Sequence, residues 1–348
     1  MLPRLRDEIR RHHGWISFAR YMEIALYEPG LGYYAAGARK FGPAGDFVTA
    51  PELGALFGRT LARQLRALSG PVLEFGAGSG ALAETLLAQH DFEYRVLELS
   101  PELRLRQQAR LGHRVQWLER LPDRIHGTVV ANEVVDAMPV HAVAWRDEAI
   151  LERGVSVEGE ELVWQERPAG GELLREAQAL EVPVPFESEI GLVARGWMRE
   201  VATRLDEGVI FIIDYGFPSR EYYHPQRATG TLMSHHRHRA HADVLAGPGE
   251  QDITAHVDFT ALASAAVDAG LEVLGYTTQA QFLVNCGITD VLAESNVENA
   301  LHYAPLASEA QKLLSPAEMG ELFKVLAVGR GVHRPLLGFT RGDRAGAL

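Results

Sequence analysis

The sequence predicts an α/β fold of the Rossmann-like type, in which helices cover both faces of a mostly parallel sheet. Three observations predict it: a short apolar run leads through a glycine-rich turn into an amphipathic helix, the next apolar run ends in an acid, and later apolar runs alternate with helical patterns. Such alternation indicates a parallel sheet, because each helix returns the chain across one face. The predicted core strands lie near residues 71–75, 94–98, 114–117, 127–132, 208–214, 271–278 and 322–329.

The glycine-rich turn, residues 74–80, reads Glu-Phe-Gly-Ala-Gly-Ser-Gly and opens a helix over 81–89. Gly76, Gly78 and Gly80 permit a tight turn and let a ligand approach the backbone, where the first N–H groups of the helix can donate to it. NAD-binding units also use a glycine turn. The G-x-G-x-G spacing and Glu74 favour S-adenosylmethionine (SAM), because a carboxylate can bind the ammonium group of SAM and would repel a pyrophosphate.

The second core strand ends at Glu98, just before a helix that begins near Pro101. An acid about 20 residues beyond the glycines can accept hydrogen bonds from both ribose hydroxyls of a bound nucleoside. Dehydrogenases share this feature, so Glu98 indicates nucleoside binding but does not distinguish NAD from SAM. Together with the glycine turn it predicts the fold of a class I SAM-dependent methyltransferase.

The remaining elements divide the chain into three parts. Residues 1–70 form an N-terminal helical segment with helices near 2–12, 17–27 and 52–68, residues 71–330 form the methyltransferase domain, and residues 331–348 form a C-terminal tail.

Two inserts are expected in the methyltransferase domain, at about 139–190 and at 217–256. The first reads as short antiparallel strands at 141–145, 149–153, 155–157 and 161–165. The second lacks periodicity and is rich in His, Gly and Pro, which predicts a lid over the substrate site.

The fourth core strand ends in polar residues, Asn132 and Glu133, and Asp136 follows. Ligands of α/β folds bind at the carboxyl ends of the strands, so we expect Asn132 beside the cofactor and the two acids beside the methyl acceptor. Methyl transfer needs an acceptor lone pair held in line with the breaking bond. Carboxylates suit a cationic acceptor such as a guanidinium. Helix capping and surface pairing are the alternative roles of Glu133 and Asp136.

Three further residues are candidates for the same site. Asp214, at the end of the fifth core strand, is predicted to act in the active-site wall, with turn formation as the alternative. His256 either accepts the proton released by methylation or is a hydrogen-bonded structural residue. Glu52 either reaches the cofactor pocket or stabilises the first turn of its helix. The histidine-rich segment 235–241 contains two arginines that would oppose a cation, so no metal is predicted.

The composition limits location and partners. A net charge of -12 disfavours a nucleic-acid partner, and the single cysteine, Cys286, excludes an internal disulfide. The N-terminus lacks an apolar signal core, and no apolar run reaches the length of a membrane span. We therefore expect a cytoplasmic protein with no membrane insertion, and a homodimer stays open.

Strings outside the glycine turn resemble the MidA-like family of SAM-dependent methyltransferases. Asn-Glu-x-x-Asp-Ala-x-Pro at 132–139 and Asp-x-Thr-x-His-Val-Asp-Phe at 252–259 are specific to that family. The resemblance also includes 21–22, 26–27, 32–34, 45–52, 57–58, 213–216, 230–232, 248–249, 278–279, 282–283, 319–320 and 323–326, and spans nearly the whole chain.

The resemblance implies a protein arginine N-methyltransferase that uses SAM. A mitochondrial member of the family is an assembly factor of respiratory complex I that dimethylates an arginine of a quinone-module subunit. A protein substrate is therefore expected, with that subunit as the first candidate. The residues alone leave two alternatives, a methyltransferase for a small-molecule acceptor and a SAM-binding assembly chaperone with little turnover.

Overall fold

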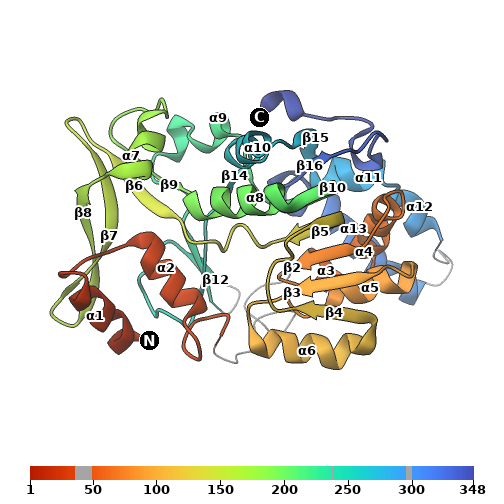
Figure 1. Ribbon diagram of the computed structural model, residues 1–348, viewed down its shortest axis with the longest axis horizontal. Coiled ribbons are helices and arrows are strands. Elements are labelled where there is room, and N and C mark those ends of the chain that lie inside the picture. The colour runs from red at the N-terminus through yellow and green to blue at the C-terminus, as the bar shows by residue number, and fades with distance from the viewer. Residues whose placement is uncertain (36–48, 237–238, 295–299) are drawn as a thin grey trace.

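The computed structural model describes residues 1–35, 49–236, 239–294 and 300–348. A central sheet with helices on both faces lies beside a part built from N-terminal helices and antiparallel strands (Figure 1). Part of the family-like segment 45–52 therefore lies outside the described residues, as do residues 237–238 of the histidine-rich segment.

The central sheet has the strand order β15-β16-β10-β5-β2-β3-β4. These strands are β2 (Val72–Phe75), β3 (Tyr94–Leu97), β4 (Val115–Leu118), β5 (Ile125–Asn132), β10 (Leu205–Phe217), β15 (Glu272–Thr278) and β16 (Phe323–Arg330). β16 runs antiparallel to both neighbours, whereas the pairs from β10 to β4 are parallel. The predicted core strands and the mostly parallel sheet are thus confirmed, and β14 (Val257–Asp258) adds to the end of β10.

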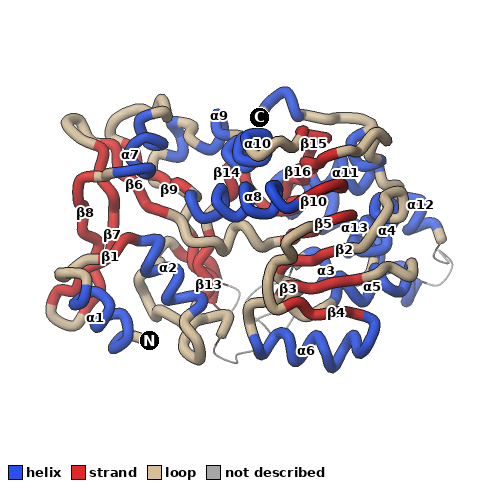
Figure 2. Tube along the Cα trace, viewed as in Figure 1, coloured by secondary structure: helices blue, strands red, loops and turns tan. Residues whose placement is uncertain are grey.

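Alternating side chains along the strands separate two hydrophobic cores. On β5, Val130 faces one core, whereas Val129 and Ala131 face the other. The first core includes residues of α4 (Leu56–Leu65), α5 (Ala81–Gln89), α11 (Gln279–Asn285), α12 (Ile288–Ala293) and α13 (Ala300–Leu314). The second includes residues of α8 (Leu192–Arg204) and α10 (Phe259–Asp268). Both faces are covered, as Figure 2 shows, which explains why the strand sequences are apolar runs.

The helix expected over 52–68 is divided into α3 (Ala50–Leu53) and α4. Glu309, on α13, accepts a hydrogen bond from the backbone N–H of Leu56 at 2.7 Å and so caps α4. A Cβ atom on Gly54 would lie 2.2 Å from the Glu309 carboxylate. The predicted helix is interrupted at Gly54 because the Glu309 carboxylate, distant in sequence, occupies the N-terminus of α4.

The antiparallel part has the strand order β1-β7-β6-β9, with β8 paired to β7. Its strands are β1 (Ile16–Ser17), β6 (His141–Trp145), β7 (Ile150–Glu158), β8 (Glu161–Pro168) and β9 (Phe186–Ile190), and α7 (Gly171–Gln178) packs on it. The strands expected separately at 149–153 and 155–157 form the single strand β7. Gly154 does not end it, and a Cβ there would meet the Trp15 ring at 2.2 Å.

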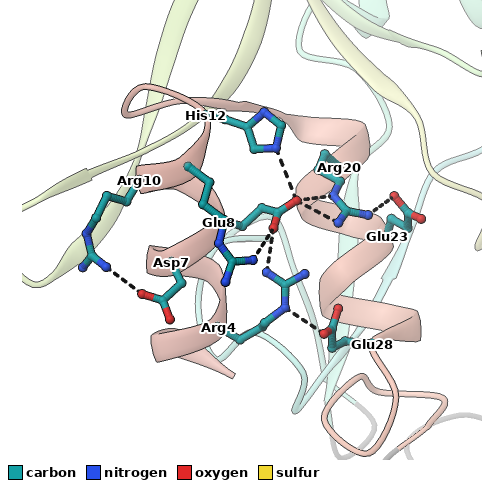
Figure 3. Close-up of polar contacts among 9 residues, drawn as sticks. Arg4, Asp7, Glu8, Arg10, His12, Arg20, Glu23 and Glu28 are labelled. Carbon is teal, nitrogen blue, oxygen red and sulfur yellow. Dashed lines mark hydrogen bonds and ion pairs between the residues drawn. The ribbon is translucent and has the colours of Figure 1, made fainter.

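Two N-terminal helices, α1 (Leu2–Arg11) and α2 (Phe18–Tyr27), pack on this antiparallel sheet. The buried carboxylate of Glu8 joins them, because it accepts hydrogen bonds from Arg4 and from Arg20, each at 2.8 Å (Figure 3). Arg4 also binds Glu28, just beyond α2, at 2.7 Å. These contacts, with the bond from Arg4 first, lower the pKa of Glu8 to about 2. The network joins α1 to α2, and α2 ends at Tyr27, whose hydroxyl donates to the backbone carbonyl of Ala137 at 2.8 Å.

The insert expected as a lid contains regular structure. It includes α9 (Ser219–Tyr222), η2 (Pro225–Arg227) and a small antiparallel sheet of order β12-β11-β13, made of β11 (Met233–His236), β12 (Arg239–His241) and β13 (Asp252–Thr254). Short polar strands with few alternating apolar residues give little sequence signal, which explains why this sheet is not predicted.

The remaining elements are α6 (Pro101–Leu111), α14 (Met319–Leu322), and the 3-10 turns η1 (Gly112–Arg114), η3 (Leu337–Phe339) and η4 (Ala345–Ala347). Residues 331–348, expected as a tail, pack against the core. Leu336 and Phe339 are buried in the first core, and Asp343 accepts a hydrogen bond from the backbone N–H of Tyr276 at 3.0 Å.

Candidate functional site

A cavity of about 860 Å³ lies at the carboxyl ends of β2, β3 and β5. Its lining includes predicted site residues from every part of the expected site: Glu52, Glu74, Gly76, Gly78, Glu98, Asn132, Glu133, Asp136 and His256. Gly80 and Asp214 do not contribute to it. We call the region around Glu74, Gly76, Gly78 and Glu98 the glycine-turn half, and the region around Glu133, Asp136, Tyr215 and His256 the β5 half.

The glycine turn has the backbone that its sequence predicts. Gly76, Gly78 and Gly80 have φ angles of 59°, 54° and 83°, a left-handed conformation that strains other residues. Gly80 is the N-cap of α5, and a Cβ there would lie 3.2 Å from the Leu111 side chain. Gly80 therefore serves helix packing, while Gly76 and Gly78 border the cavity.

Glu74 is buried at the end of β2 and accepts a hydrogen bond from the Tyr94 hydroxyl at 2.8 Å. Burial raises its pKa to about 7, the nearby Glu98 adds to the shift, and the Tyr94 hydrogen bond opposes it. A cation in the glycine-turn half would favour the ionised form of Glu74.

Both carboxylate oxygens of Glu98 are held in place. One accepts from the backbone N–H of Ser100 and the other from Gln107 Nε2, each at 2.9 Å. Gln107 is fully buried, also donates to the carbonyl of Gly78 at 3.0 Å, and accepts from Trp117 Nε1 at 3.0 Å. Gln107 thus fixes the glycine turn relative to Glu98. Sequence reasoning missed it because a glutamine inside an amphipathic helix carries no distinguishing signal.

Glu52, in α3, accepts a hydrogen bond from the hydroxyl of Ser79 in the glycine turn. This contact places Glu52 on the wall of the cavity rather than on the outer surface. Its helix has Thr49 at the N-cap position, but Thr49 makes no side-chain capping bond.

The loop after β5 is organised by Asp214. One oxygen of its buried carboxylate accepts from the backbone N–H groups of Val134, Val135 and Asp136 at 3.0–3.3 Å. Glu133, at the start of this loop, has a φ of 54°, which is rare for a residue other than glycine. Asp214 therefore binds the backbone of this loop and does not line the cavity, so the wall role expected from the sequence is wrong.

Half-buried Glu133 and buried Asp136 lie close enough to interact electrostatically. Glu133 Oε1 accepts from the backbone N–H of Ala50 at 3.1 Å and from Asn132 Nδ2 at 3.3 Å. Burial, and next the charge of Asp136, raise the pKa of Glu133 to about 8. Burial raises the pKa of Asp136 to about 6, although the Tyr215 hydroxyl donates to its Oδ2 at 2.6 Å. Two acids held this close favour a bound cation.

His256 lines the β5 half with a neutral ring. Burial lowers its pKa to about 4, and Arg227 and Lys324 add to the shift. The Thr231 hydroxyl accepts from its backbone N–H at 3.0 Å. Its ring Nδ1 is buried without a hydrogen-bond partner among the described residues, so the structure does not show the hydrogen-bonded structural role, and proton acceptance stays a prediction.

Other residues of the lining were not singled out by their chemistry. Tyr27 donates to the carbonyl of Ala137 at 2.8 Å, and Tyr34 donates to Asp252 Oδ1 at 2.9 Å. Tyr215 belongs to the family-like segment 213–216, but the sequence assigned no role to this tyrosine. These side chains come from three distant segments, so spacing alone could not bring them together.

The glycine-turn half fits the groups of SAM. It offers a cradle of left-handed glycines, a buried acid for the ammonium group at Glu74, and an oriented acid for the ribose at Glu98. Asn132 Oδ1, between the two halves, is buried without a hydrogen-bond partner among the described residues, so it is available to a ligand. A cavity of this size suits a nucleoside cofactor together with an acceptor side chain.

Fold and site together define a class I SAM-dependent methyltransferase. The model of a family described as S-adenosyl-L-methionine-dependent methyltransferases matches residues 56–277, and the chain belongs to this family. A crystal structure of a protein from Burkholderia thailandensis bound to S-adenosyl-homocysteine is similar, with 48% identity and a TM-score of 0.96, covering 100% of this chain and 96% of that chain. The cofactor is therefore SAM, as predicted.

Two curated relatives match most of the chain. The protein arginine methyltransferase NDUFAF7 homolog of Drosophila melanogaster is 28% identical, covering 94% of this chain and 86% of its own. Protein arginine methyltransferase NDUFAF7 of Danio rerio is 29% identical, covering 90% and 83%. Both are named as mitochondrial proteins, which contradicts the cytoplasmic location expected from the sequence. Among the described residues, no helix combines the length and apolar character needed to cross a membrane.

Proposed function

We propose that this methyltransferase transfers the methyl group of SAM to a guanidinium nitrogen of an arginine in a protein substrate. The observation that carries the proposal is a pair of acids, half-buried Glu133 and buried Asp136, in the cavity that also contains the glycine turn. The names of the NDUFAF7 relatives support the same acceptor.

The charges of the β5 half suit a guanidinium. Asp136 Oδ1 is buried and, within the described ranges, has no hydrogen-bond partner. A protonated arginine would supply N–H donors to such an oxygen and would lower the pKa of both acids, so that they ionise when the substrate binds. A neutral small-molecule acceptor would leave the two acids without a cation.

Bound SAM supplies a methyl group on a positively charged sulfur. Glu74 and Glu98 would hold the cofactor by its ammonium and ribose groups, and Asn132 would orient it. Glu133 and Asp136 would hold the arginine so that a nitrogen lone pair faces the methyl carbon. The new nitrogen–carbon bond forms as the sulfur–carbon bond breaks, and the nitrogen then loses a proton. A carboxylate of the β5 half would take that proton and pass it to solvent.

The loop held by Asp214 gives these acids a fixed geometry. The Asp214 carboxylate accepts from the consecutive backbone N–H groups of Val135 and Asp136. The left-handed backbone of Glu133 directs the Glu133 side chain toward the start of α3. We therefore assign Asp214 a positioning role. The first acceptor to test is the quinone-module subunit of complex I that the MidA-like resemblance suggests.

The test is a transfer experiment with SAM that carries a labelled methyl group. The protein is incubated with a cell lysate, and the labelled material is separated into protein, nucleic acid and small molecules, followed by amino-acid analysis of the protein fraction. The proposal expects label in methylarginine, and peptide mapping then locates the residue. Label confined to small molecules or to another amino acid would contradict it. SAM binding without any transferred label would favour an assembly chaperone.

A further inference from the structure

Aromatic rings stand next to the acids of the β5 half. Tyr215, His256 and Phe323 all line the cavity together with Asp136. The Tyr215 ring centroid lies 5.2 Å from that of His256 and 5.4 Å from that of Phe323, with interplanar angles of 81° and 69°. Rings at such angles present their faces in different directions, as the walls of a pocket do.

Tyr215 connects these rings to the acid. Its hydroxyl donates to Asp136 Oδ2 at 2.6 Å, which fixes the carboxylate beside the rings. The other oxygen, Oδ1, is the buried atom without a partner among the described residues. One ligand group could therefore contact the Asp136 Oδ1 atom and the rings of Tyr215, His256 and Phe323.

A neighbouring ring outside the cavity lining, that of Phe217, already binds a guanidinium of the protein. The guanidinium carbon of Arg227 lies 3.8 Å from the ring centroid of Phe217, which is 5.3 Å from the ring of His256. Phe217 does not line the cavity. Lys324 is also directed to Phe217, at 5.5 Å, and its ammonium donates to the backbone carbonyl of Leu322 at 3.2 Å. The cations of the protein itself are thus placed on Phe217, outside the cavity.

The neutral state of His256 matters for the cavity side. Arg227 and Lys324 lie near it, and with burial they keep its ring uncharged at neutral pH. An uncharged ring presents an aromatic face to a cation, whereas an imidazolium would repel it.

We propose that Tyr215, His256 and Phe323 form, with Asp136, an aromatic and acidic subsite that binds the guanidinium of the acceptor arginine. The rings contribute cation–π contacts, and Asp136 contributes a charge-assisted hydrogen bond. A planar guanidinium can stack flat on a ring while its edge donates to a carboxylate, whereas an ammonium group has no flat face to stack, so the subsite favours arginine over lysine. The inference depends on the proposed arginine acceptor.

The test uses the arginine peptide that carries the label in the transfer experiment. Phe323 is replaced by leucine, and in a second variant by 4-fluorophenylalanine, which keeps the size of the ring but withdraws electrons from its face. We expect KM for the peptide to rise about 5- to 20-fold in Phe323→Leu and by a smaller factor in the fluorinated variant. Affinity for S-adenosylhomocysteine should stay unchanged in both.

Phe217→Leu is the matched control, because Phe217 belongs to the same ring cluster but does not line the cavity. It removes the ring that binds Arg227 and Lys324 without changing the cavity lining, so KM for the peptide should rise by a smaller factor than in Phe323→Leu. An unchanged KM in both Phe323 variants would overturn the subsite, and so would equal losses in Phe217→Leu and Phe323→Leu. If the wild type labels no arginine at all, the proposed function fails instead, so the two failures are distinguishable.

Discussion

The acids of the glycine-turn half of the cavity are Glu74 and Glu98, whereas those of the β5 half are half-buried Glu133 and buried Asp136. Glu98 has a donor on each oxygen, but Asp136 keeps one oxygen without a partner among the described residues. From this difference we expect that the glycine-turn half is preformed for its ligand, and that a bound cation completes the β5 half by favouring the ionised form of its acids.

Glu133→Gln should show the largest difference between the two halves, because it should change turnover much more than SAM affinity. The substitution keeps the shape of the side chain and removes the charge that holds the acceptor, so kcat should fall at least ~100-fold, which corresponds to about 3 kcal/mol. Affinity for SAM should change little. Steady-state kinetics and calorimetry measure the two quantities. Full activity of Glu133→Gln would remove Glu133 from the mechanism.

Glu98→Ala should have the opposite pattern. Loss of a charge-assisted pair with the ribose should weaken SAM binding by ~1.5–3 kcal/mol and leave KM for the acceptor peptide nearly unchanged. Calorimetric titration with SAM checks the first effect and transfer kinetics at saturating SAM check the second. Wild-type affinity for SAM in this variant would show that Glu98 does not hold the cofactor.

The pKa of Glu74 predicts how cofactor affinity depends on pH. Burial raises this pKa to about 7, so the carboxyl is protonated below that pH and ionised above it. The ammonium group of the ligand binds the ionised form, so affinity should fall by up to about tenfold per pH unit below pH 7 and level off above it. Titrations with S-adenosylhomocysteine between pH 5.5 and about 8.5 span this window. The slope should decrease in Glu74→Gln, and an identical slope would exclude Glu74 as its source.

A smaller effect is expected at Gln107. Gln107→Met keeps the volume but removes the donors to Glu98 and to the Gly78 carbonyl, so SAM affinity should fall about fivefold, near 1 kcal/mol. Trp117→Phe is the control, because it removes the indole donor to Gln107 and leaves both of its contacts with the glycine-turn half. Equal affinities in the two variants would mean that Gln107 does not position Glu98.

The two halves also differ in how well the sequence predicts them. Glu74, the glycines and Glu98 lie within one strand-turn-helix-strand stretch, so local spacing determines their geometry. Tyr27, Tyr215 and Phe323 reach the β5 half from segments about 100 or more residues apart, and only the packed fold shows that they share one cavity.

Asp214 illustrates the remaining limit of sequence reasoning. Its place in the fifth core strand was predicted, although β10 continues to Phe217 beyond the predicted end at residue 214. Its orientation depends on the conformation of the loop after β5. The left-handed backbone of Glu133 presents consecutive N–H groups to Asp214, so its carboxylate binds them and does not face the cavity. No pattern of residue types distinguishes these two orientations.

The central claim, that the β5 half binds a cationic guanidinium, is tested most directly by calorimetry on the complex with S-adenosylhomocysteine. The labelled arginine peptide is compared with the same peptide carrying citrulline, which keeps the shape but has no charge. Burial raises the pKa of Glu133 to about 8, so it is largely protonated at pH 7, and binding of a cation should expel that proton. The account predicts at least tenfold tighter binding of the arginine peptide, about 1.4 kcal/mol, with proton release seen as an enthalpy that depends on the buffer. Equal affinities without proton release would contradict it.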